Sequence, residues 1–192
     1  MFATLSSRRG RVGGLLIVLL AGAARAEAGP PLLCDPFRPE PGAALLPWAP
    51  APTSWNAPDP DYDRRQLVGD VLRLLTPQAS ILARMENLRR ATIYATADPR
   101  LAGELLAAVT ARTTTAAGEP SRDPLAWFDA GYLIETYRQA SHIARWDMLT
   151  GDARRMWTMN RAPSADGVAL VRKAIALSGS NRAMEHAMSL MR

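Results

Sequence analysis

Apolar residues recur at intervals of three and four positions along most of the chain from residue 61 onward. This spacing places them on one face of an α-helix, whereas a strand needs apolar and polar positions to alternate. No convincing alternating run of β-branched residues occurs, so we expect no sheet. The pattern predicts an all-α fold in which five to six helices pack as antiparallel hairpins.

Capping residues and prolines indicate where these helices begin and end. Thr76-Pro77, Asp98-Pro99 and Asp123-Pro124 each place a hydrogen-bond acceptor directly before a proline at the first helical position. Ser164 and Ser180 are further candidate caps, and Gly179 is a candidate stop. The predicted helices span residues 61–75, 77 to about 97, 99 to the threonines at 113–115, 124 to about 148, a short segment near 154–160, 164–178, and 180 to the C-terminus.

Two of these helices have distinctive faces. The second is expected to turn Ile81, Leu82, Met85, Leu88 and Ala95 inward and to carry a Glu86–Arg90 ion pair on its outer side. The fourth is apolar or aromatic around most of its circumference, which is typical of a helix in the middle of a bundle.

The first 26 residues have the three-part layout of a secretory signal peptide. Three arginines precede an uncharged run from Val12 to Ala24, and the small-residue triplet Ala24-Arg25-Ala26 follows. We expect cleavage after Ala26 and a periplasmic or secreted protein. Ser7 to Val12 also resembles the twin-arginine export motif, so both export routes stay open. The apolar run is short for a transmembrane helix, and no later segment is expected to span a membrane.

The net charge excludes a nucleic-acid partner. Four of the 23 basic residues and none of the 18 acidic ones lie in the predicted signal peptide, so the remaining chain has 19 basic against 18 acidic residues. A nearly neutral domain lacks the positive field that phosphate backbones require.

Residues 27–60 form a proline-rich segment before the predicted helical domain at 61–192. Ten of the 15 prolines fall here, which predicts an extended arm or linker, either partly disordered or draped over the domain. Trp48 and Trp55 either pack on the chain's own domain or dock on a partner. Cys34, the single cysteine, cannot form an internal disulfide; a free thiol, an intermolecular bridge and lipid attachment remain alternatives.

Two fragments resemble parts of a known helical repeat. Trp127 to Tyr132 places a small-residue pair shortly after a tryptophan, and Val171 to Leu177 has the alanine spacing of a paired helix. They resemble the first and second helices of a tetratricopeptide repeat, although they do not fall in one 34-residue frame. The resemblance implies helical hairpins of that kind and a protein-binding role.

No catalytic motif is found, so we expect a protein that is not an enzyme and needs no cofactor. The sequence has no Gly-x-Ser-x-Gly, no phosphate-binding glycine loop and no His-Glu-x-x-His. Met184, Met188 and Met191 have a spacing that can bind Cu(I) in an exported protein. The same spacing is that of the core face of an amphipathic helix.

Polar residues interrupt the apolar fourth helix and give the main candidate site. Glu135 and Arg138 are placed to pair on adjacent turns. One interpretation is a hydrogen-bonded network that fixes helix register; the other is a ligand pocket in the bundle. The pocket would be formed by Trp127, Tyr132, Glu135, Arg138, His142 and Trp146.

The sequence therefore leaves two hypotheses. The first is an exported, non-catalytic helical protein that serves as a protein-interaction or adaptor module and binds a protein partner through a helical groove or the arm. The alternative is a periplasmic helical bundle that binds a small ligand or Cu(I).

Overall fold

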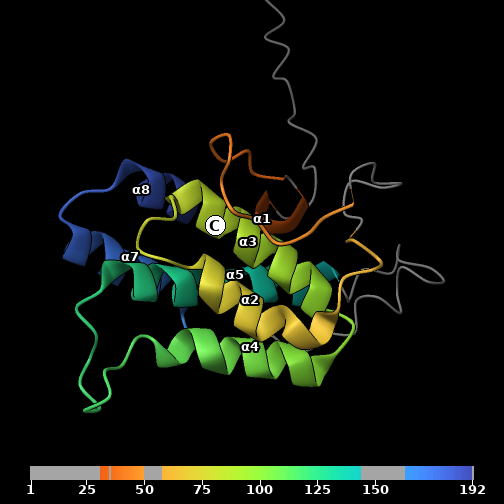
Figure 1. Cartoon of the computed structure of the whole chain (residues 1–192). Helices are drawn as coiled ribbons and strands as arrows, with labels where there is room; N and C mark the ends of the chain where they lie inside the picture. The colour runs from red at the N-terminus through yellow and green to blue at the C-terminus, as the bar shows by residue number, and fades with distance from the viewer. Residues whose placement is uncertain (1–30, 35, 50–57, 144–162, 192) are drawn as a thin grey trace, which may run out of the picture.

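The computed structural model in Figure 1 describes residues 31–34, 36–49, 58–143 and 163–191. These residues form seven α-helices and one short 3₁₀ helix. In chain order they are α1 (Pro31–Cys34), η1 (Arg64–Gln66), α2 (Leu67–Leu74), α3 (Ile81–Ala95), α4 (Pro99–Ala111), α5 (Pro124–Ile143), α7 (Gly167–Ser178) and α8 (Arg182–Ser189).

The prediction of an all-α fold is confirmed. The described residues contain no strand, and one isolated bridge joins Thr114 and Pro120 in the turn between α4 and α5. The predicted leader at 1–26, the end of the fourth predicted helix at 144–148 and the short helix near 154–160 lie outside the described residues. No helix of the described part of the chain is both long and apolar enough to cross a membrane.

Several helix ends follow the predicted capping chemistry. Asp98 accepts hydrogen bonds from the backbone N–H groups of Arg100 and Leu101, at 2.9 and 3.1 Å, so α4 begins where the sequence predicts. Gly179 ends α7 with a positive φ of 86°, a conformation that glycine adopts without steric penalty.

Three predicted caps are wrong by one to four residues. α3 begins after Ser80 instead of Thr76, because the Ser80 hydroxyl accepts from the Ala83 N–H at 3.1 Å. The carbonyl of Thr76 is instead bound by Arg84. Asp166 replaces Ser164 as the cap of α7, and Asn181 replaces Ser180 as the cap of α8.

Helix α5 lies at the centre of the fold. It contacts α1, α3, α4 and α7, and its most extensive contact is with α7. Residues from Phe128 to Tyr137 are buried without interruption. The uniform apolar and aromatic character of this helix is therefore explained by neighbours on all sides.

A pair of glycines allows α5 and α7 to approach closely. A Cβ atom at Gly131 would lie 2.5 Å from the carbonyl oxygen of Gly167, and one at Gly167 would lie 2.5 Å from the carbonyl oxygen of Gly131. Gly131 also faces Val171, while Gly167 faces Glu135, so the two helices run antiparallel. Any larger residue at this crossing would push the backbones apart.

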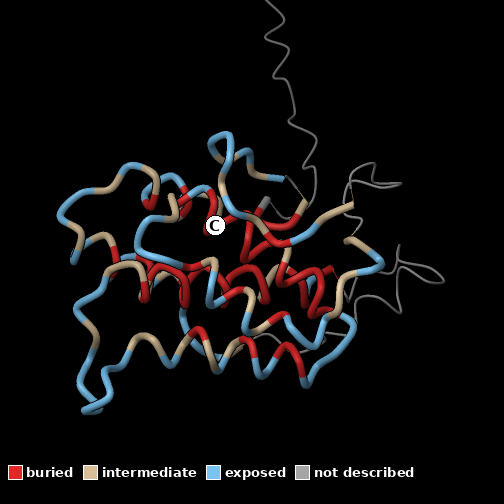
Figure 2. Tube along the Cα trace, viewed as in Figure 1, coloured by how far each residue is buried: buried red, intermediate tan, exposed pale blue. Residues whose placement is uncertain are grey.

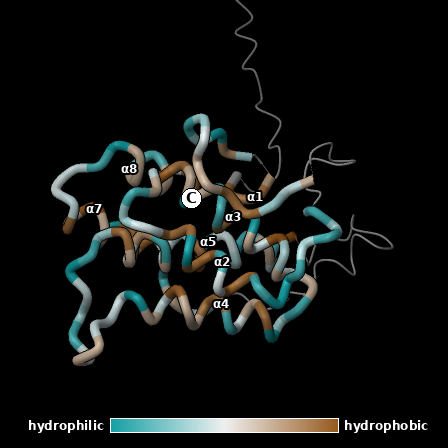
Figure 3. The backbone as a smooth tube through the Cα atoms, in the orientation of Figure 1, coloured by the Kyte–Doolittle hydropathy of each residue, from teal (hydrophilic) through white to brown (hydrophobic). Residues whose placement is uncertain are grey.

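Helix α3 is buried on nearly every side, although many of its residues are polar. All of its residues except Leu82 and Arg90 are buried. Figure 3 shows hydrophilic residues along this helix, and Figure 2 shows that most of the helix is nonetheless buried. Two expectations are therefore wrong: Leu82, expected inward, is 37% exposed, and Glu86, expected on the outer side, is buried.

We predict that Gly131→Ala destabilises the fold by about 1–3 kcal/mol or more, because the added methyl overlaps the backbone of α7. Gly103→Ala is the matched control. Gly103 lies inside α4 with no atom within 4 Å of an added Cβ, so this change should stabilise by roughly 0.5–1 kcal/mol through helix propensity. Urea unfolding measures both, and equal effects of the two substitutions would contradict the close crossing.

Candidate functional site

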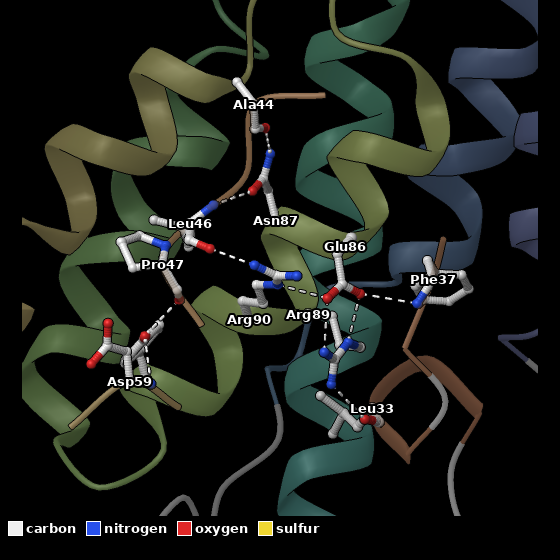
Figure 4. Close-up of polar contacts among 11 residues, drawn as sticks. Leu33, Phe37, Ala44, Leu46, Pro47, Asp59, Glu86, Asn87, Arg89 and Arg90 are labelled. Atoms are coloured by element: carbon white, nitrogen blue, oxygen red, sulfur yellow. Dashed lines mark hydrogen bonds and ion pairs between the residues drawn. The ribbon is translucent and has the colours of Figure 1, made fainter. Parts of the chain in front are cut away.

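The proline-rich arm lies along α3 and is held by a row of polar side chains. We call Glu86, Asn87, Arg89, Arg90 and Tyr94 the α3 row, and residues 31–34 and 36–49 the described arm. Every member of the row contacts the main chain of the segment from Leu33 to Asp59. Figure 4 shows these contacts. Since backbone groups are the common target, the row binds the main chain of the arm, most of which lies outside regular secondary structure.

Asn87 acts as a two-point clamp on the arm. Its Oδ1 accepts from the Leu46 N–H at 2.8 Å, and its Nδ2 donates to the Ala44 carbonyl oxygen at 3.0 Å. Asn87 is completely buried, so loss of either bond would leave a backbone group without its partner. One amide side chain therefore replaces the neighbouring strand that an extended segment would otherwise pair with.

Tyr94 binds the main chain at two positions, Pro47 and Asp59. Its hydroxyl donates to the Pro47 carbonyl oxygen at 2.7 Å and accepts from the Asp59 N–H at 3.0 Å. Residues 47 and 59 therefore meet at one buried oxygen atom. This places the start of the helical domain and the end of the described arm side by side on α3.

Two arginines share one carboxylate under the arm. Glu86 pairs with Arg89 at 2.8 Å and with Arg90 at 2.7 Å, and its Oε2 also accepts from the Phe37 N–H at 3.0 Å. Further N–H donors of the two arginines go to arm carbonyls, from Arg89 to Leu33 and from Arg90 to Leu46. Neutral carbonyl oxygens thus complete the solvation of a buried charge cluster.

Apolar side chains anchor the arm at three places. Leu32, Leu33 and Leu46 are completely or almost completely buried in the core. Phe37 contacts the ring of Tyr132 edge-on, with centroids 6.3 Å apart. Of the two arrangements predicted for residues 27–60, the described part is draped over the domain. Although prolines are dense there, one helical turn forms at α1, which begins at a proline as the first turn permits.

The two arm tryptophans have different outcomes. Trp48 is half-buried on the chain's own domain, edge-on to Tyr94 at 5.7 Å, with the guanidinium carbons of Arg89 and Arg90 at 5.1 and 5.3 Å from its ring centroid. Trp55 lies outside the described residues.

The burial of Leu32 and Leu33 argues against lipid attachment at Cys34. Lipid attachment requires cleavage of the chain directly before this cysteine, and that cleavage would remove two core residues.

The described members of the predicted pocket face different neighbours. Trp127 donates from Nε1 to the Ser121 carbonyl at 2.8 Å, and the Lys173 ammonium lies 3.4 Å from its ring centroid. Tyr132 is completely buried, stacked on Phe128 and in edge contact with the arm. His142 is exposed, and Trp146 lies outside the described residues. Of the six, Glu135 and Arg138 form an ion pair, at 3.1 Å.

Glu135 and Arg138 instead join α5 to the start of α7. Glu135 is buried and accepts hydrogen bonds from the backbone N–H groups of Gly167 and Val168, and Arg138 donates to the Ala165 carbonyl at 2.7 Å. A carboxylate at a helix N-terminus is favoured by the helix dipole. Burial nevertheless raises the pKa of Glu135 above its ordinary value, and the nearby Arg138 opposes that shift.

A second buried group repeats the arrangement of two arginines and one carboxylate. Arg84 and Arg112 each lie 2.6 Å from Asp129, and Arg84 and Asp129 are fully buried. Burial raises the pKa of Asp129, with both arginines opposing the shift. The other donors reach the carbonyls of Leu75, Thr76 and Ala79 after the end of α2. This group fastens α3, α4 and α5 to the α2–α3 turn.

The three methionines of the predicted Cu(I) site lie in the core or pack against it. Met184 and Met191 are buried in the core, and Met188 is partly buried against it. Within the residues that the structure describes, no three His, Cys, Asp or Glu side chains gather as a metal site. A cavity of about 320 Å³ lies between the arm turn at 40–44 and the α2–α3 turn, and the predicted pocket residues do not line it.

Comparison with known proteins identifies no relative. No family model matches the chain, and no curated protein or solved structure matches it.

Sequence reasoning missed the α3 row as a binding surface. It treated Glu86 and Arg90 as a solvent-facing pair, since periodicity shows which side of a helix is polar but does not show what covers it. Two signals point to the row. Asn87 is a poor helix former in mid-helix, and Leu32, Leu33 and Leu46 are apolar residues in a segment too rich in proline to form a core alone.

The raised pKa of Glu135 gives a prediction for pH dependence. Between its ordinary pKa of 4.5 and its higher folded pKa, the folded state binds more protons than the unfolded state, so the free energy of unfolding falls as pH rises. Glu135→Gln removes this titration. The stability of the native chain relative to this variant, measured by urea unfolding, should therefore decrease as the pH rises above about 4.5. A relative stability that increases with pH would mean that Arg138 and the α7 N-terminus outweigh burial.

Proposed function

We propose that this protein is an exported, non-catalytic helical module for protein interaction, and that its α3 row binds an extended segment of a partner protein. The observation that carries the proposal is the contact between the row and residues 33–59. Side chains of one helix bind the main chain of a segment whose contacting residues lie 35 to 56 positions away in sequence.

The chemistry of the row supports this role. Asn87 offers one donor and one acceptor, Tyr94 offers a hydroxyl, and Arg89 and Arg90 each donate to one arm carbonyl. All of these groups meet backbone atoms, which every protein segment carries. A partner segment of the same extended shape would present the same groups in the same order.

The chain's own arm is the resident occupant in this proposal. A tethered segment has an effective concentration on the order of millimolar, so it competes strongly with a free segment. Partner binding would therefore proceed by displacement of the arm, and any change that weakens arm docking should favour the partner.

The export part of the proposal rests on the amino-terminal sequence. The basic start, the uncharged run and the small-residue triplet ending at Ala26 support a cleaved leader. Cleavage after Ala26 would leave Leu32 and Leu33, which are buried in the core, in the mature chain.

Binding of a free peptide tests the proposed function. The probe is a labelled synthetic peptide of residues 36–49, titrated into the full-length chain and followed by fluorescence anisotropy. Leu46→Ala in the chain weakens its own arm and should tighten peptide binding by roughly tenfold or more. Asn87→Ala, introduced into that Leu46→Ala chain, removes the clamp and should weaken binding by roughly fivefold or more.

The two substitutions are expected to change peptide affinity in opposite directions, which distinguishes a binding surface from a general loss of stability. Trp127→Ala, which removes another half-buried tryptophan with a cation contact, serves as a control outside the row and should leave peptide affinity unchanged. If Leu46→Ala and the added Asn87→Ala shift peptide affinity in the same direction, or if no peptide binds the folded Leu46→Ala chain, the proposed function fails.

A further inference from the structure

Resting on the proposed function, we propose that the partner segment carries a triplet of an apolar residue, a proline and an aromatic residue. In the chain itself this triplet is Leu46, Pro47 and Trp48. Each position makes its own combination of contacts with side chains of α3, so the surface recognises sequence in addition to main chain.

The first position is defined by burial and two backbone contacts. The Leu46 side chain is 1% exposed and belongs to the core cluster. Its N–H is held by Asn87 and its carbonyl oxygen by Arg90. Because the residue before a proline avoids the helical region, the following Pro47 keeps this residue extended, as the two contacts require.

The second position suits proline for two reasons. Tyr94 contacts the Pro47 carbonyl oxygen at 2.7 Å, while proline has no N–H that would need an acceptor. A fixed φ also reduces the conformational freedom that the segment loses on binding. Aromatic side chains that donate to carbonyls of proline-containing segments are a recurring mode of peptide recognition.

The third position favours an aromatic ring because of the charge beneath the arm. Arg89 and Arg90 both pair with Glu86, and the Trp48 ring centroid lies 5.1 and 5.3 Å from the central carbons of their guanidinium groups. The negative face of an aromatic ring attracts such a cation. The Tyr94 ring contacts the same Trp48 ring edge-on, with centroids 5.7 Å apart, and the centroid of the Tyr62 ring lies 4.7 Å from that of Tyr94.

Other arm residues lack this combination of contacts. Leu45 neighbours the triplet but is only partly buried and lies outside the core cluster, and Pro41 is exposed. They provide matched controls within one peptide for the leucine and proline positions. A peptide recognised by main chain alone would tolerate alanine equally at all of these positions.

The test measures binding of variant peptides of residues 36–49 to the full-length Leu46→Ala chain by fluorescence anisotropy. We expect Leu46→Ala in the peptide to weaken binding by roughly tenfold or more, Trp48→Ala by roughly tenfold, and Pro47→Ala by about two- to fivefold. Leu45→Ala and Pro41→Ala should change affinity by less than about twofold. Arg90→Gln in the chain should reduce the difference in affinity between the native peptide and the Trp48→Ala peptide.

The outcomes distinguish the triplet from the proposed function. If the native peptide binds and all the alanine peptides bind equally well, the triplet is overturned while peptide binding stands. If the native peptide does not bind, both are overturned. Should the Leu46→Ala chain fail to show a cooperative unfolding transition, the full-length Trp48→Ala chain, which loses only a half-buried ring, replaces it, and the same outcomes apply.

Discussion

The structure depends on one constraint, which is that a charged helix lies in the interior and each of its polar groups needs a partner there. Arg84, Glu86, Asn87 and Arg89 are all buried on α3. A buried donor without an acceptor typically costs about 1–3 kcal/mol, and an unpaired charge costs more. The helices do not supply enough acceptors, because their carbonyls are used within each helix. Other parts of the chain supply them: the arm, through the single helical turn α1 for Arg89 and through Leu46 for Arg90, and the α2–α3 turn for Arg84.

This constraint explains why a proline-rich segment belongs to the domain. Apart from the single turn of α1, its described residues are not part of any helix, and each proline removes a donor that would itself need a partner. The two groups of two arginines and one carboxylate follow the same rule at opposite sides of α3, with Glu86 under the arm and Asp129 toward the centre. In a third charged group, Glu135 with Arg138, the additional partners are the backbone groups at the start of α7. Chain segments outside the helices are thus fixed by charge in each case.

The sequence predicts the helical scaffold better than it predicts the site. Three- and four-residue periodicity is a local property, so the all-α fold, the Asp98 cap and the central place of α5 could be predicted. The close contact of Gly131 with Gly167 joins residues 36 positions apart, and small size alone does not identify which glycines meet. The α3 row was missed for the same reason, since no local pattern tells that residues 33–47 will cover Glu86 and Asn87. Trp127, Tyr132 and Glu135 were grouped by closeness along one helix, yet they face different neighbours.

Native-state hydrogen exchange of the full-length chain tests most directly whether the arm is a separable part of the fold. The amides of Phe37 and Leu46 report on docking, because they donate to Glu86 and Asn87. The account predicts that both exchange far more slowly than in a free peptide, yet through an opening of lower free energy than that of the α3 and α5 amides. Exchange at free-peptide rates would show that the arm is not docked. If the arm amides exchange only together with the α3 and α5 amides, the arm never opens on its own. Displacement by a partner requires such an opening, so this result would contradict the account.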